Sequence, residues 1–191
     1  MGRALSLFTL CLLAAPLRAA GDGKVFLTVD EALKLAFPEC EIERTTRYLG
    51  EEEEKRVETL SRAELESRVV RPYVARHDGK LVGTAYFDAH RVRTKNEVLM
   101  IVVAPDERIV RVEVLAFAEP LEYLPRGSFY AQFAGRRLDS ELDLKGAIRG
   151  IAGASLSATA ATSAARRTLA LHRVLAEQEP APALATSSAS R

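Results

Sequence analysis

The stretch RPYVARHDGKLVGTAYFDAH, Arg71 to His90, decides the fold. Two alternating apolar and polar runs flank Asp78-Gly79, and an Asp-Gly pair between such runs is the strongest short-range signal for a β-hairpin. The stretch EVLMIVVAPDERIVRVEVLAFAEP, Glu97 to Pro120, repeats this form around a Pro-Asp turn. Two adjacent hairpins predict an antiparallel sheet of at least four strands, with one face packed against helices.

Shorter elements are expected before the sheet. Residues 27–37 have the pattern of a helix, because Thr28 can cap its N-terminus and the acidic residues that follow suit the positive end of the helix dipole. The segment CEIERTTRYL, residues 40–49, is expected to contain a strand. Residues 50–67 predict a second helix, and its opening run of four glutamates is more typical of a solvated face than of a metal-binding cluster.

A long C-terminal helix is expected at about residues 156–177, after a glycine-rich turn. One side carries small apolar residues at helical spacing, which would let the helix lie very close to the sheet; they are Ala158, Ala161, Ala165 and Leu169. The opposite side carries the polar residues Thr159, Thr162, Arg166 and Arg173. The order of elements predicts an α+β domain, in which an antiparallel sheet of two hairpins packs against helices.

The two ends of the chain are expected to lie outside this domain. Residues 1–20 combine a basic residue, a short apolar run and small residues at the end, which is the pattern of a signal peptide. An uncleaved anchor and a lipid anchor at Cys11 are the alternatives. Residues 178–191 are low in complexity and are expected to be disordered. Residues 21–68 then form an N-terminal helical and strand segment, and residues 69–177 form the main domain.

Composition narrows the possible functions. The chain carries 27 bases and 26 acids, so it lacks the excess of positive charge that accompanies nucleic-acid binding. Once a signal peptide is removed, Cys40 is the remaining cysteine, which argues against an internal disulfide, a CxxCH haem site and a cysteine-rich metal site. The three histidines are scattered, and neither HExxH nor GxSxG is present, so no hydrolase site is indicated.

The stretch GIAGASLSATAATSAARR, Gly150 to Arg167, contains the candidate site. Gly150 and Gly153 permit tight turns and the close approach of a ligand. A helix that begins here offers free N–H groups and a positive dipole end, which suit a phosphate group. The alternative is structural, with Ser155 or Ser157 acting as the N-cap of the helix.

The segment Ala152-Gly153-Ala154-Ser155-Leu156-Ser157 resembles the C-terminal signature of the FMN-binding domain family. That domain occurs in flavin-carrying components of the sodium-translocating NADH:quinone oxidoreductase and of the related Rnf electron-transport complex. The family pattern is Ser/Thr-Gly-Ala-Thr, any residue and Ser/Thr, followed by a helix. A second segment is similar in order and spacing, and consists of a strand followed by Glu119-Pro120-Leu121, Phe129, Gln132-Phe133 and Gly135. The resemblance covers roughly residues 70–175.

The resemblance implies a specific way of holding the cofactor. In the family, the threonine after Gly-Ala carries FMN through a phosphoester bond that a flavin transferase forms outside the cytoplasm. This role falls on Ser155, whose primary alcohol can form the same bond. The chain departs from the family at Arg149, where the transferase motif usually has an aspartate. FMN held without a covalent bond, or no FMN at all, are therefore the alternatives.

The expected cofactor-binding residues come from three segments that would hold the phosphate and flank the flavin ring. The set is Gly153, Ala154, Ser155, Leu156, Ser157, His90, Arg93, Glu119 and Tyr123. Structural alternatives exist for the upstream members: an ordinary surface histidine at His90, an exposed strand end at Arg91 and Arg93, and a loop-packing aromatic at Tyr123. No metal ligand and no catalytic residue is expected.

The resemblance thus implies an exported FMN-binding flavoprotein that carries electrons rather than acting as a stand-alone catalyst. It would lie in the periplasm or on the outer face of the cytoplasmic membrane. Its partners would be the flavin transferase and a membrane electron-transfer complex or a periplasmic reductase, with no nucleic acid. The alternative is an envelope binding or scaffold domain that keeps the fold but has lost the flavin.

Overall fold

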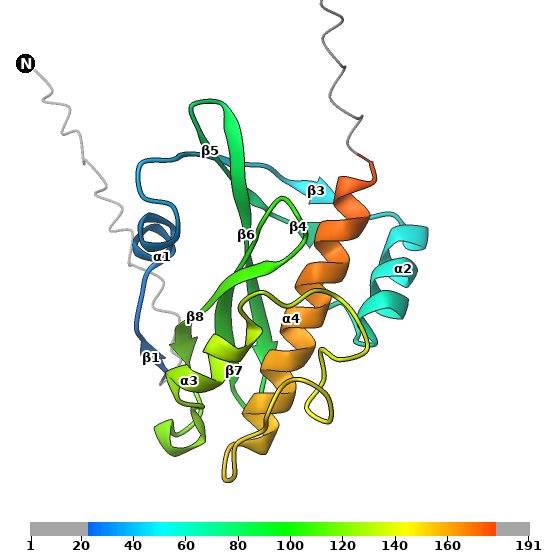
Figure 1. Ribbon diagram of the computed structural model, residues 1–191. Helices are drawn as coiled ribbons and strands as arrows, with labels where there is room; N and C mark the ends of the chain where they lie inside the picture. The colour runs from blue at the N-terminus through cyan, green and yellow to red at the C-terminus, as the bar shows by residue number, and fades with distance from the viewer. Residues whose placement is uncertain (1–22, 179–191) are drawn as a thin grey trace, which may run out of the picture.

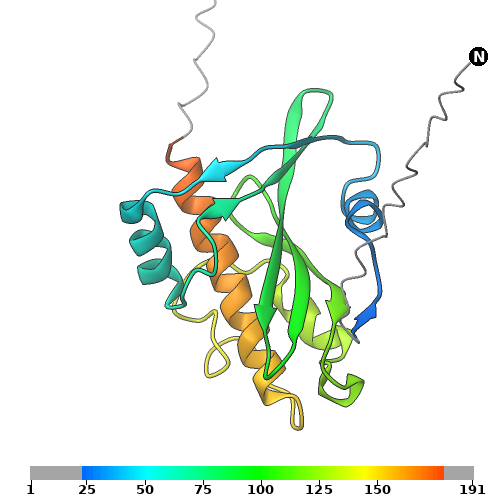
Figure 2. The same cartoon turned by 180° about the vertical axis from the view of Figure 1, so that it is seen from behind.

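The computed structural model describes residues 23–178 and confirms the predicted α+β class (Figure 1). The expected signal peptide at 1–20 lies outside the described residues, and so does nearly all of the expected disordered tail at 178–191. Within the described part, one antiparallel sheet lies between α1 (Val29–Ala36) on one face and α4 (Ser155–Ala176) on the other, as Figures 1 and 2 show from opposite sides.

The sheet contains both predicted hairpins and has the strand order β1-β8-β7-β6-β5-β2. Its strands are β1 (Lys24–Val25), β2 (Glu41–Arg44), β5 (Tyr73–His77), β6 (Lys80–Arg91), β7 (Asn96–Val103) and β8 (Ile109–Phe117). The segment 21–68, which the resemblance leaves unexplained, supplies the two edge strands, β1 beside β8 and β2 beside β5. A separate ribbon pairs β3 (Arg47–Tyr48) with β4 (Val69–Val70).

The Asp78-Gly79 turn joins β5 to β6 as predicted. Both residues have positive φ, +49° at Asp78 and +74° at Gly79, which is the backbone of a two-residue hairpin turn that matches the twist of the strands. The second hairpin turns at 104–108, where the N–H of Ala104 donates to the carbonyl of Arg108 at 2.8 Å. The local turn signals therefore fix the connection of the four central strands.

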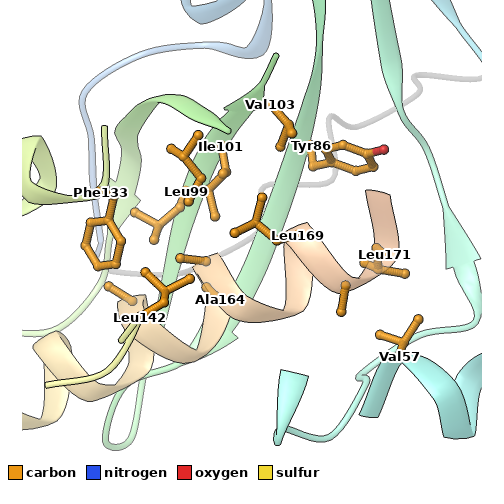
Figure 3. Close-up of a cluster of buried hydrophobic side chains, with 14 of the residues drawn as sticks. Val57, Tyr86, Leu99, Ile101, Val103, Phe133, Leu142, Ala164, Leu169 and Leu171 are labelled. Atoms are coloured by element: carbon orange, nitrogen blue, oxygen red, sulfur yellow. The ribbon is translucent and has the colours of Figure 1, made fainter. Parts of the chain in front are cut away.

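Strand β7 explains why the domain has three layers. Its side chains alternate, so that Leu99, Ile101 and Val103 face α4 while Met100 and Val102 face α1. Both faces are covered, which accounts for the nearly unbroken apolar run in the sequence. Figure 3 shows the larger of the two cores, where the odd-numbered β7 side chains lie against α4.

The N-terminal helices correspond to the predicted ones, with one difference. Thr28 caps α1 as expected, accepting a hydrogen bond from the N–H of Glu31 at 3.3 Å while the Glu31 carboxylate reaches back to Thr28. Helix α2 (Glu51–Ser61) packs against α4 but ends six residues before the predicted limit at 67. It stops because Arg62 adopts the left-handed conformation, with its N–H bonded to the carbonyl of Glu58.

Helix α4 lies close to the sheet through small residues, as predicted. Ala158, Ala161 and Ala165 are essentially unexposed. The expectation of a polar outer side is wrong for Thr162 and Arg166, which are 5% and 7% exposed, because α2 and the segment 139–142 cover that side. The short helical turns η1 (Leu121–Tyr123), α3 (Gly127–Tyr130) and η2 (Ala131–Phe133) follow β8.

Candidate functional site

The candidate site lies where the chain enters α4. Gly153 has φ +86°, a left-handed conformation that a side chain would strain, and it turns the chain into the helix. The N-cap is Ala154, which has no side chain able to bond the first turn, so the prediction that Ser155 or Ser157 caps this helix is wrong. The N–H groups at the start of a 22-residue helix are thus left without a side-chain partner from the cap position.

The two serines of the first turn have different roles. The Ser157 hydroxyl donates to the backbone carbonyl of Tyr123 at 2.6 Å, and this bond fixes η1 against the start of α4. Ser157 is buried, so its hydroxyl serves the fold. The Ser155 side chain is exposed and makes no hydrogen bond to any described residue, which leaves its hydroxyl free to meet a ligand.

Most of the residues selected from the sequence line one cavity. Its volume is about 200 Å³, and its wall contains seven of the nine: Arg93, Tyr123, Gly153, Ala154, Ser155, Leu156 and Ser157. They come from the turn after β6, from η1 and from residues 153–157 at the start of α4, which are far apart in the sequence. The cavity therefore combines a cation, an aromatic ring and the positive end of a helix.

Arg93 and Tyr123 form one wall of this cavity. The Arg93 guanidinium lies over the Tyr123 ring at 4.9 Å from the centroid, within the range of a cation–π contact. Arg93 is exposed and forms no ion pair or hydrogen bond with the described residues, so its donors remain available to an anion.

Glu119 positions Arg93 without lining the cavity. Its carboxylate accepts hydrogen bonds from the N–H groups of Thr94 at 2.6 Å and Lys95 at 2.8 Å, and from the Thr94 hydroxyl at 3.1 Å. These bonds hold the pKa of Glu119 below its ordinary value, and the nearby Arg93 charge acts in the same direction. Glu119 thereby ties the turn after β6 to the chain after β8.

We expect Glu119→Ala to release the 92–95 turn while leaving the sheet intact. The N–H groups of Thr94 and Lys95 lose their common acceptor, so their hydrogen exchange should accelerate by about tenfold or more. Exchange measured by NMR checks this, with Glu122→Ala as the control because Glu122 is exposed and has no such bonds. Equal exchange in both variants would show that Glu119 does not hold the turn.

Gln132 holds the loop that leads into the site. Its side-chain amide donates to the carbonyl of Arg149 at 3.1 Å and accepts from the N–H of Arg149 at 2.8 Å. This two-point contact uses only the backbone of Arg149, so the exposed Arg149 side chain is not required for it. The Gln-Phe segment identified in the sequence thus supports the loop before Gly153.

His90, unlike the others, lies away from the cavity. It is 3% exposed rather than on the surface, and both ring nitrogens are used: Nδ1 is 2.8 Å from Asp88 and Nε2 is 3.1 Å from Glu97. Burial alone would lower the pKa of His90, but the hydrogen bonds and charges of Asp88 and Glu97 outweigh it and raise that pKa to about 9. His90 is therefore an imidazolium at neutral pH, enclosed by two carboxylates.

These contacts belong to a buried charged network that the sequence did not reveal. Arg167 donates to both carboxylate oxygens of Asp88, at 3.1 and 2.8 Å, and the Tyr130 hydroxyl donates to Glu97 at 2.6 Å. The order Arg167–Asp88–His90–Glu97–Tyr130 thus alternates charge and then ends in a neutral phenol. The one available signal was Asp88 and His90 on the same face of a strand, two residues apart.

A larger apolar groove lies beside the candidate site. Its volume is about 700 Å³, and its walls include the β8 residues Val110, Val112 and Val114 together with Leu124 and Pro125. Tyr123 lines the 200 Å³ cavity, and the next residue, Leu124, lines this groove. The groove and the 200 Å³ cavity are therefore lined by consecutive residues of the same loop.

Other classes of site receive no support from residues 23–178. In that range no three metal-ligating side chains of the His, Cys, Asp or Glu type gather to bind an ion. None of the described helices has the length and apolar character needed to cross a bilayer. Comparison of the chain with known protein families, with curated proteins and with solved structures finds no match.

Proposed function

We propose that the protein is an FMN-binding electron carrier, with the phosphate group of FMN at the N-terminus of α4. The observation that carries the proposal is the 200 Å³ cavity, because seven of the nine residues selected from the sequence as candidate FMN contacts line it together. The cofactor supplies the electron-transfer chemistry, and the chain supplies position and charge.

The residues present fit a phosphate group. The uncapped start of α4 offers N–H donors and a positive dipole end, and Arg93, which also lines the cavity, adds a cation that forms no ion pair with a described residue. Gly153 lets the backbone come close to the ligand. Ser155 presents a free hydroxyl at the same place, which suits either a hydrogen bond to phosphate or the phosphoester linkage that the resemblance implies.

The flavin ring needs a different environment from the phosphate. A cavity of about 200 Å³ is below the 300–1,000 Å³ typical of sites that enclose a drug-sized ligand. The neighbouring groove of about 700 Å³ has valine, leucine and proline walls that suit an aromatic ring system. The cofactor would therefore extend from the polar cavity across the 119–126 loop, where Tyr123 and Leu124 contact it.

The proposed setting follows from the resemblance. An exported carrier would receive its FMN from a flavin transferase and exchange electrons with a membrane complex or a periplasmic reductase. The expected envelope location depends on the signal peptide at 1–20 and is part of the proposal. The alternative, an envelope scaffold that has lost flavin, is favoured by the small volume of the cavity and by Arg149 at the position of the family's aspartate.

Flavin loading tests the proposal. We expect co-expression with a flavin transferase to give a yellow protein, and mass spectrometry to place an acid-stable FMN adduct on the 153–157 segment. Without the transferase, purified protein titrated with FMN should quench flavin fluorescence, and Arg93→Met should weaken this binding by about tenfold because it removes a charge-assisted contact to phosphate.

Two serine variants distinguish the modes of binding. Ser155→Ala should abolish the covalent adduct, whereas Ser140→Ala, an exposed serine outside the cavity, should leave it unchanged. Protein that takes up FMN in neither form would overturn the flavin proposal and support the scaffold alternative. FMN that binds equally well to the Arg93→Met protein would overturn the placement of its phosphate.

A further inference from the structure

A second cavity, of about 410 Å³, lies on the far side of β6 from β7. Its volume is in the range of sites that enclose small ligands. Four consecutive β6 residues, Tyr86 to Ala89, form one side, and the segment from Leu65 to Arg71 forms the other. Arg167, Thr168 and Leu171 of α4 form its base.

The β6 side of this cavity includes an open strand edge. Strand β5 pairs with β6 only as far as Tyr73 opposite Ala85, whereas β7 stays paired with β6 as far as Arg91. Pro72 ends the pairing, and the preceding β4 pairs with β3 instead. Among residues 23–178, no strand therefore covers the second edge of β6 from Phe87 onward, and its backbone groups on that side can pair with an added strand.

Two buried donors at the base of the cavity lack partners. Arg167 is 7% exposed and bonds Asp88 through Nε and Nη2, while its Nη1 bonds no described residue. The Thr168 hydroxyl likewise has no hydrogen bond to a described residue, although Thr168 is 1% exposed. Every fully enclosed polar side-chain atom of the described residues has a hydrogen-bond partner. Arg167 Nη1 and the Thr168 hydroxyl have none among residues 23–178, so they are not fully enclosed, and they open into the cavity that these residues line.

The remaining walls combine apolar surface, which suits a short apolar chain, with the exposed residues Glu66 and Ser67. Val70, Leu171 and the Tyr73–Phe87 pair, whose rings meet edge to face at 5.2 Å, supply apolar surface. At the rim, Arg71 is exposed and forms no ion pair with a described residue. The Arg167 charge is balanced by Asp88, but its free N–H group still favours an acceptor that carries negative charge.

From the open edge and the two donors together, we infer that this cavity binds an extended, apolar peptide segment with a free C-terminal carboxylate. The peptide pairs as a short strand with Phe87–Ala89, and its carboxylate accepts hydrogen bonds from Arg167 Nη1 and the Thr168 hydroxyl. Strand addition at an open sheet edge, with pockets for alternate side chains, is a recurring mode of peptide recognition. Backbone pairing with β6 and a C-terminal carboxylate at Arg167 and Thr168 thus define the class of ligand.

The test uses the full chain and four small probes. Acetyl-Ala-Val-Leu with a free carboxylate is titrated beside its C-terminal amide, a backbone N-methylated form and 4-phenylbutyrate, which has a carboxylate but no peptide groups. We expect the free acid to bind at least about tenfold more tightly than the other three. In the wild-type protein, NMR shifts should concentrate at the amides of Phe87–Ala89.

A matched pair of variants avoids disturbing the Arg167–Asp88 contact. Thr168→Val removes the free hydroxyl and should weaken binding of the free-acid peptide severalfold. Thr162→Val removes a buried hydroxyl that bonds its own helix at the carbonyl of Ala158, away from the cavity, and should leave binding unchanged. Equal binding of acid and amide, 4-phenylbutyrate binding as tightly as the peptide, or shifts elsewhere in the domain would each overturn the inference.

Discussion

Glu97→Ala should lower the free energy of unfolding by about 3–5 kcal/mol, the largest loss expected from one substitution in this domain. The Glu97 side chain is wholly buried and accepts hydrogen bonds from both His90 and Tyr130. Removing it leaves the buried Tyr130 phenol without its acceptor and leaves the His90 imidazolium with Asp88 as its remaining carboxylate contact. A buried charge that has lost one of its partners is costly because its desolvation is less fully offset.

The same network predicts a loss of stability at alkaline pH. The folded-state pKa of His90, about 9, is above the ordinary value of 6.5, so folding favours the protonated ring. The stability that this provides, about 3 kcal/mol, is fully present below pH 6.5 and is lost as pH rises to about 9. Burial beside Glu97 raises the pKa of Tyr130 above its ordinary 10, which adds a further loss only above pH 10.

Urea denaturation between pH 6 and pH 9.5 checks both expectations. The wild-type protein should lose stability across this interval, and His90→Gln should start lower and change little with pH. Asp106→Asn is the control, because its ion pairs with Arg108 and Arg137 are exposed and should contribute less than about 1 kcal/mol. A flat wild-type profile would mean that His90 is not protonated in the folded protein.

Arg166→Met should lower the free energy of unfolding by about 2–4 kcal/mol, and the loss of order should be greatest in α2 and in the 139–148 segment. Arg166 is a buried guanidinium without a carboxylate partner among the described residues, and burial lowers its pKa. It donates instead to four backbone carbonyls, those of Leu60, Ser61, Asp139 and Leu142, at 2.8–3.3 Å. Two of these belong to the C-terminal end of α2, where carbonyls lack partners within the helix.

The expected pattern can be separated from a general loss of stability. Hydrogen exchange should rise first in α2 and in the 139–148 segment, before the central strands are affected. Arg166→Lys should recover little, because an ammonium cannot reach four acceptors in one plane. Arg173→Met is the matched control two turns later on α4, since its pair with Glu107 is partly exposed and should contribute about 1 kcal/mol or less. Equal losses of unfolding free energy in Arg166→Met and Arg173→Met would show that the four hydrogen bonds of Arg166 do not hold α2 and the 139–148 segment against α4.

The central sheet and the long helix could be predicted because their signals are local. An Asp-Gly turn, period-two alternation and a run of alanines at helical spacing each depend on a few neighbouring residues. The strand expected within residues 40–49 is confirmed as β2, but its place at the sheet edge, the edge strand β1 and the end of α2 could not be predicted in the same way. β1 and β2 pair with strands far away in the sequence, and the left-handed Arg62 that ends α2 has no glycine to signal it.

The candidate cavity could be predicted in part for a similar reason. The glycine and the serines lie in one short segment, and Arg93 and Tyr123 follow strands whose order the hairpins determine. The roles of Ser157, Glu119 and His90 could not be assigned, because each depends on a partner that folding brings near. A histidine between two carboxylates and a serine bound to a distant carbonyl look ordinary in sequence.

The alanine face of α4 has a mechanical consequence. Methyl groups leave little slack between the helix and the sheet, so the helix cannot tilt or slide without moving β6 and β7 as well. Ser157 also bonds η1 and Arg166 bonds four carbonyls, so two side chains of α4 further restrict the position of its first turn. An anion that arrives at Ser155 would meet donors already aligned, and little ordering entropy would remain to be lost on binding.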